Sequence, residues 1–191
     1  MRDRITVNNI VAWVASLFVI GAFVITFFTE YTLTGGGAVL HMRSIVYGVK
    51  YIYGTDQGQY EMIIVPAEYQ VGPAIVPLIG ACILGASTFV TIVISLTVSN
   101  VSLRKTILGF AALFAIVGGI LSFFVFKTGR EQMILVSGGE MTMQQLEQAL
   151  EAGAIKESAG GAVATGVIAI IAGLTSLIAQ LAYNTSAIKE Y

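Results

Sequence analysis

The strongest constraint on this chain is a pair of long uncharged runs, Pro77–Val98 and Thr106–Phe126, joined by a short polar stretch. Each run holds about 20 residues, which is the length an α-helix needs to cross about 30 Å of hydrocarbon. The connection, Ser99–Lys105, ends in two adjacent cations, Arg104 and Lys105. Because cytoplasmic loops are enriched in Lys and Arg, this pattern predicts a membrane helical hairpin whose turn faces the cytoplasm.

Two more apolar runs flank this hairpin. The first follows a short cationic start and is longer than a signal-peptide core, with no small-x-small cleavage site after it, so we expect a retained membrane helix. The last run is rich in small residues. The sequence therefore predicts one domain, residues 1–191, built as an all-α four-helix transmembrane bundle. The expected helices cover about 10–29, 74–98, 106–126 and 161–183.

Composition supports a membrane protein and excludes several other classes. Hydrophobic residues make up 56% of the chain and charged residues 11%, whereas soluble domains average about 25% charged residues. A formal net charge of −1 gives no attraction to nucleic acid. Cys82 is the one cysteine and His41 the one histidine, so a disulfide within the chain and a His- or Cys-based metal site are ruled out. We expect no cofactor and no metal.

The segment between the first two helices, about 30–72, has the pattern of strands. Ile45–Tyr53 alternates with period two and is rich in β-branched and aromatic residues, and Gly54–Gly58 is typical of a turn. Tyr60–Val65 follows as a returning strand, and Tyr31–Thr34 and Val39–Met42 are shorter candidates. We expect a small antiparallel sheet on the extracytoplasmic side of the membrane.

The second exterior segment, about 128–158, is expected to add one strand and one short helix. Gln132–Val136 is the predicted strand. Thr142 and Gln145 have the spacing of a capping box at a helix start. Gly153 is a natural helix stop.

The helix bodies contain no Asp, Glu, Lys, Arg or His. Ion-coupled transporters and proton relays usually place such groups at membrane depth, so a transporter acting alone is disfavoured. The polar side chains that remain in the helices are hydroxyls, and they could line a pore. The favoured interpretation is that they bond to their own helix. The residues are Thr88, Thr91, Ser95, Thr175 and Ser176.

Glycines in these runs form a second pattern. Small residues let helix backbones approach closely, and such packing drives helix association in lipid. The favoured interpretation is that these positions pack the four helices together, and the alternative is that one glycine face docks another subunit. The positions are Gly80, Gly85, Gly109, Gly118, Gly119, Gly166 and Gly173.

Orientation follows from where the cations lie. The predicted inner segments are short and carry Arg2, Arg4, Arg104, Lys105 and Lys189 close to helix ends. The longer outer segments carry Arg43, Lys50, Lys127, Arg130 and Lys156. The higher density of cations in the inner segments predicts a multi-pass protein of the cell membrane with both termini in the cytoplasm.

The layout resembles the claudin-like tetraspan architecture: a long β-rich first loop, a tight inner turn and a shorter second loop. The resemblance covers the whole chain as topology. The Trp and paired cysteines of that family's first loop have no counterpart, because the only Trp is Trp13 and the only Cys is Cys82. No functional residue is carried over.

These patterns favour a non-catalytic accessory or scaffold subunit of a membrane or cell-envelope complex. Its partners would be the lipid bilayer and other membrane subunits or further copies of itself. Tyrosines suit such contacts, and the candidates are Tyr47, Tyr51, Tyr53 and Tyr60. The alternative is an oligomeric pore or small-molecule conduit. A lipid-directed enzyme has only Glu30, Glu68 and Glu131 as poor candidates, so we expect no enzyme.

Overall fold

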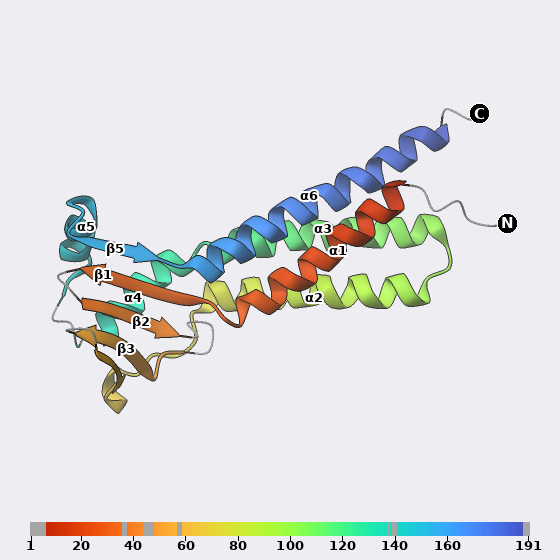
Figure 1. The fold of residues 1–191 in the computed structure, drawn as a ribbon. Coiled ribbons are helices and arrows are strands. Elements are labelled where there is room, and N and C mark those ends of the chain that lie inside the picture. Colours follow the sequence, from red (N-terminus) through yellow and green to blue (C-terminus); the bar gives the residue numbers. More distant parts are fainter. Residues whose placement is uncertain are drawn as a thin grey trace. The chain divides into compact units, whose positions relative to one another are not determined.

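The computed structural model describes residues 7–35, 38–43, 48–56, 59–136, 138 and 141–188. The chain divides into two compact units. The helical unit comprises Met1–Val24, Ile79–Leu121 and Ala164–Tyr191, and the sheet unit comprises Ile25–Leu78 and Ser122–Val163. Figure 1 gives the order of the elements along the chain.

Most of the helical unit comes from α1 (Val7–Thr26), α2 (Ile75–Thr97), α3 (Val101–Ser122) and α6 (Gly160–Ile188). Among the described residues, three helical segments are long and apolar enough to cross a membrane, namely Ile75–Thr97, Ser102–Val136 and Gly160–Leu181. The apolar part of α1, Ile10–Thr26, is shorter. The three segments suggest a multi-pass membrane protein.

The polar connection between α2 and α3 is shorter than predicted. Helix α3 begins at Val101 rather than at Thr106, so Arg104 and Lys105 lie in its first turns. The cause is the Asn100 side chain, whose Oδ1 accepts a hydrogen bond from the Leu103 N–H at 3.1 Å. This is the geometry of an N-cap, and it starts the helix within the predicted polar stretch.

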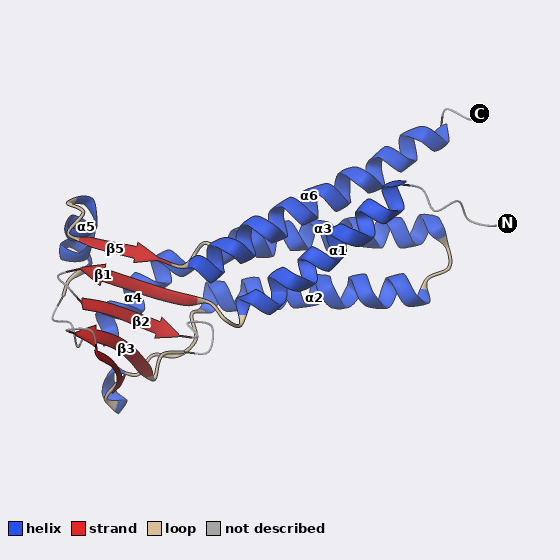
Figure 2. Ribbon diagram, in the orientation of Figure 1, coloured by secondary structure: helices blue, strands red, loops and turns tan. Residues whose placement is uncertain are grey.

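The sheet unit holds a five-stranded antiparallel sheet in the order β4-β3-β2-β1-β5. Its strands are β1 (Glu30–Gly35), β2 (Ala38–Arg43), β3 (Tyr51–Asp56), β4 (Gln59–Ile64) and β5 (Ile155–Ser158). Figure 2 distinguishes the strands, in red, from the helices, in blue. The predictions of β1, β2 and β4 are confirmed to within one residue at each end.

The strand predicted over Ile45–Tyr53 is displaced toward the C-terminus. Residues 44–47 lie outside the described residues, and β3 extends through Asp56 into the predicted turn. Gly48 has φ +94°, and a Cβ there would lie 2.7 Å from the Val71 carbonyl oxygen. A positive φ lies outside the extended backbone of a β-strand, so one strand cannot run continuously through Gly48.

The strand predicted over Gln132–Val136 is wrong, because these residues end helix α4 (Val125–Val136). The buried positions follow helical spacing: they are Val125, Gly129, Gln132, Met133 and Val136. The second segment does add a strand to the sheet, but from β5. An apolar run of Met, Ile, Leu and Val does not by itself distinguish a strand from a helix end.

The short helix α5 (Met143–Glu151) begins as predicted. The Gln145 N–H donates to the Thr142 hydroxyl at 3.3 Å, and the Gln145 side chain accepts from the Thr142 N–H at 2.9 Å. After α5, Gly153 has φ +70° and the Ala154 N–H donates to the Ala149 carbonyl at 2.9 Å. This is a Schellman ending, so the predicted stop at Gly153 is confirmed.

The core of the helical unit is built from small side chains, including Ala22, Ala115 and Ala169, around the buried Leu84. Hydroxyls reinforce it, because Ser87 of α2 donates to the Ala111 carbonyl of α3 at 2.7 Å. Such hydrogen bonds between helices are typical of membrane bundles.

Several of the predicted packing glycines lie where helices approach closely. A Cβ at Gly118 would lie 2.7 Å from Leu84 Cγ, and one at Gly80 would lie 2.9 Å from Leu121 Cβ. A Cβ at Gly85 would lie 3.0 Å from Phe23 Cε2.

Helix α6 makes equally close approaches. A Cβ at Gly119 would lie 3.0 Å from the Gly166 carbonyl oxygen, and one at Gly173 would lie 2.8 Å from the Ala112 carbonyl oxygen. Gly109 has more room, because its nearest such atom is Gln180 Oε1 at 3.9 Å. These contacts lie within one copy of the chain.

We predict that Gly173→Ala destabilises the helical unit by about 1–3 kcal/mol, because its Cβ would press on the backbone of α3. Gly21→Ala is the matched control, since no heavy atom lies within 4 Å of a Cβ there. Alanine favours helix, so the control should equal wild type or gain up to about 1 kcal/mol. Thermal unfolding in one detergent compares them, and a Gly173→Ala variant as stable as the control contradicts this packing.

Candidate functional site

A charged network joins three elements of the sheet unit. Arg130 of α4 forms a two-pronged ion pair with Glu157 of β5, in which Nε donates to Oε2 at 2.9 Å and Nη2 donates to Oε1. The Tyr31 hydroxyl of β1 donates to the same Glu157 Oε2 at 2.9 Å. The side chains of Arg130 and Glu157 are 28% and 16% exposed. The network therefore binds β1 and β5 to α4.

The electrostatics of this network favour an ionised Glu157 and a neutral Tyr31. Hydrogen bonds from the Arg130 guanidinium lower the pKa of Glu157, against the opposing effect of its partial burial. Burial, followed by the hydrogen bond to Glu157, raises the pKa of Tyr31 well above its usual range. Tyr31 is fully buried, and a Cβ on Gly129 would lie 2.6 Å from its ring. The network is thus a rigid support.

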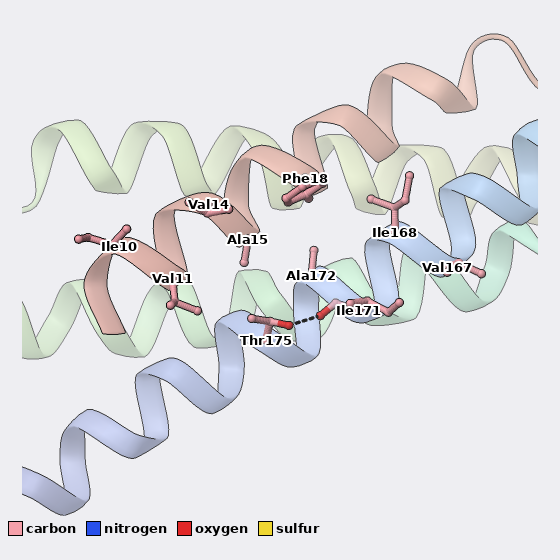
Figure 3. Close-up of a pocket in the computed structure, with 10 residues that line it drawn as sticks. All are labelled: Ile10, Val11, Val14, Ala15, Phe18, Val167, Ile168, Ile171, Ala172 and Thr175. Carbon is pink, nitrogen blue, oxygen red and sulfur yellow. Dashed lines mark hydrogen bonds between the residues drawn. The ribbon is translucent and has the colours of Figure 1, made fainter. Parts of the chain in front are cut away.

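A groove of about 400 Å³ runs between α1 and α6 of the helical unit. Its lining is almost wholly apolar, as Figure 3 shows. The hydroxyl it contains, that of Thr175, donates to the Ile171 carbonyl of its own helix at 2.8 Å. The groove therefore offers no free polar group to orient a reactive ligand, and it suits hydrocarbon. The lining residues are Ile10, Val11, Val14, Ala15, Phe18, Val167, Ile168, Ile171, Ala172 and Thr175.

Three of the four tyrosine positions predicted as a partner surface are brought to one face of the sheet. The register pairs position 51 with 64, 53 with 62 and 55 with 60, so positions 51, 53, 60, 62 and 64 share that face. Tyr53 is half-buried there. Tyr47 lies outside the described residues.

Strand β4 is one edge of the sheet, and its described side chains are exposed. Met62 is 54% exposed, Ile63 48% and Ile64 65%, and Glu61 is exposed as well. Exposure of three consecutive apolar residues means that neither face of this strand is covered. Sequence reasoning identified the strand but missed its apolar edge, for which the run Met62-Ile63-Ile64 was the signal.

The hydrogen-bond pattern shows which backbone groups of β4 point away from the sheet. The Val65 N–H donates to the Lys50 carbonyl at 3.0 Å, so odd-numbered residues of this strand bond toward β3. Antiparallel ladders alternate strictly. The N–H and C=O groups of Tyr60, Met62 and Ile64 therefore point outward, on the side where the described part of the chain adds no further strand.

The other candidate residues do not form a reactive constellation. His41 lies on β2 with Nδ1 3.8 Å from a Glu30 carboxylate oxygen, and Glu68 and Glu131 are exposed. In the part of the chain that the structure describes, no group of three or more His, Cys, Asp or Glu side chains could hold a metal ion. Comparison with known proteins finds no matching family model and no matching curated protein.

We predict that Glu157→Gln destabilises the full-length protein at pH 7 by about 1–3 kcal/mol, because it weakens hydrogen bonds to a charged group. Since the folded-state pKa of Glu157 is lowered, its contribution is present above the unfolded value of about 4.3 and is lost as the pH falls through the folded value. Unfolding is measured in detergent between pH 7 and about pH 3. The variant should lose less stability over this range than the wild-type protein does.

The control for this experiment is Glu131→Gln, an exposed residue of α4. It should be as stable as the wild-type protein at pH 7 and should lose as much stability as the wild-type protein on acidification. Equal behaviour of the two variants would contradict a stabilising role for the network.

Proposed function

We propose that this chain is a non-catalytic integral membrane protein that acts as an accessory or scaffold subunit of a membrane or cell-envelope complex. In this proposal four helices span the cell membrane and both termini lie in the cytoplasm. The sheet unit lies on the extracytoplasmic side, where the edge of β4 contacts a partner protein.

The distribution of charge supports this placement. Within the described residues, the charged side chains of the helical unit are Arg104 and Lys105, at the start of α3. The other described charges lie in the sheet unit. Cations at one helix end mark the cytoplasmic side, and a charged sheet unit belongs in water. Helix α1 adds a fourth span, because its 20 residues extend about 30 Å at 1.5 Å per residue.

The observation that carries the proposal is the exposed apolar edge of β4. Proteins normally protect edge strands with Lys, Pro, bulges or a covering element. The six residues Gln59–Ile64 contain no Lys, Arg or Pro, and Met62, Ile63 and Ile64 are exposed. An edge of this kind is a ready site for strand addition, in which main-chain bonds give affinity and side chains give specificity.

The polar side chains of the sheet unit support a scaffold rather than an enzyme. Arg130, Glu157 and Tyr31 satisfy one another and hold the sheet to α4. A catalytic acid or base needs reach to a substrate, whereas these groups are committed to structure. The rigid sheet that they support can present its free edge to a partner.

Photo-crosslinking in native membranes tests the proposed function. A photoreactive residue replaces Ile64 on the β4 edge, and the control carries it at Glu147, which is exposed on α5. We expect a discrete protein adduct from position 64 and none from position 147. Adducts only with lipid, or equal labelling from both positions, would overturn the proposal.

A further inference from the structure

We propose that the β4 edge pairs antiparallel with β4 of a second copy of this chain, with the two-fold axis passing through Met62. The inference rests on the proposed function, in that it names the partner of the edge already described. In the assembly, two five-stranded sheets would join into one continuous sheet.

Main-chain hydrogen-bonding groups alternate between inward and outward along β4, and this alternation restricts how two copies can pair. Tyr60, Met62 and Ile64 carry the outward N–H and C=O groups, so these residues must oppose one another across the junction. A symmetric pairing must then centre on a single residue, because only such registers match outward groups to outward groups. Within the middle of the strand the centre is Glu61, Met62 or Ile63.

Charge and overlap select among the three registers. A centre at Glu61 places two carboxylates directly opposite each other, about 4.5 Å apart at Cα, which is unfavourable. A centre at Ile63 pairs only Met62 and Ile64 of the outward residues. A centre at Met62 pairs all three outward residues, which gives about six main-chain bonds between the copies, and places Glu61 opposite Ile63.

The side chains agree with the Met62-centred register. Met62 would face its own counterpart, and both are 54% exposed in the single chain. Ile64, 65% exposed, would lie opposite position 60 of the second copy. An isologous contact needs a self-complementary surface. This strand supplies one, because its only charge is Glu61 and that charge finds no like charge opposite.

Disulfide trapping in native membranes tests this register. The background is Cys82→Ala, since Cys82 is the single cysteine and is exposed on α2. A Met62→Cys chain should form a disulfide-linked homodimer on mild oxidation, because a hydrogen-bonded pair has Cα atoms about 5.5 Å apart, within disulfide range. Differently tagged Glu61→Cys and Ile63→Cys chains, expressed together, should form the mixed dimer.

The single variants serve as register controls. Ile63→Cys alone should give little homodimer, because its copies lie diagonally, about 7–8 Å apart. Glu61→Cys alone lies on the same diagonal and should behave likewise. A homodimer formed by Glu61→Cys in preference to Met62→Cys would overturn the Met62-centred register.

A charge variant provides a second measurement that does not depend on oxidation. Met62→Lys places two cations opposite each other and should lower the dimer fraction by about tenfold or more in native mass measurement. Gln144→Lys, at an exposed position of α5, should leave it unchanged. Photo-adducts from position 64 with a different protein, together with no trapped homodimer, would overturn self-pairing while leaving the proposed function standing.

Discussion

The need to satisfy every main-chain hydrogen-bonding group shapes this molecule. A bilayer supplies no hydrogen bonds, so spanning segments must satisfy their backbone internally. The long apolar helices do this, and Ser87 and Thr165 direct even their hydroxyls to carbonyls of neighbouring helices. Outside the helices, the sheet satisfies its inner strands and leaves outward rows on its two edge strands, β4 and β5. Strand β5 carries the exposed Lys156, a charge typical of protected edges, whereas β4 exposes Met62, Ile63 and Ile64, so the β4 row is the one suited to a further strand.

The two edge strands of the sheet, β5 and β4, have different surroundings. At the β5 end, the ion pair between Arg130 and Glu157 and the buried Tyr31 fasten the strands to α4. At the β4 end, Met62, Ile63 and Ile64 are apolar and exposed, next to the exposed Glu61. The proposed contact at the β4 edge rests on this difference between the two ends of the sheet.

Local patterns predicted much of this fold. Uncharged runs of about 20 residues located the long helices, and the Thr142–Gln145 spacing located α5. Two predictions differed from the structure for local reasons. Strand β3 begins after Gly48, whose φ is positive, and the apolar end of α4 has the composition of a strand. In α4, the helical spacing of Gly129, Gln132 and Met133 was the decisive pattern.

Long-range relations could not be read from the sequence. Strand β1 pairs with β5 more than a hundred residues later, and that pairing makes β4 the opposite edge. The link between Tyr31 and Glu157 spans the same gap. Of the predicted site, positions 51, 53 and 60 come together on one face of the sheet.

Hydrogen exchange at the β4 amides tests most directly whether this edge is the contact surface of the assembled protein. The N–H groups of Met62 and Ile64 point outward, whereas that of Ile63 bonds toward β3. In native-membrane assemblies, we expect Met62 and Ile64 to exchange as slowly as Ile63, and to exchange fast once detergent separates the chains. Fast exchange of both outward amides in the intact assembly would contradict the account.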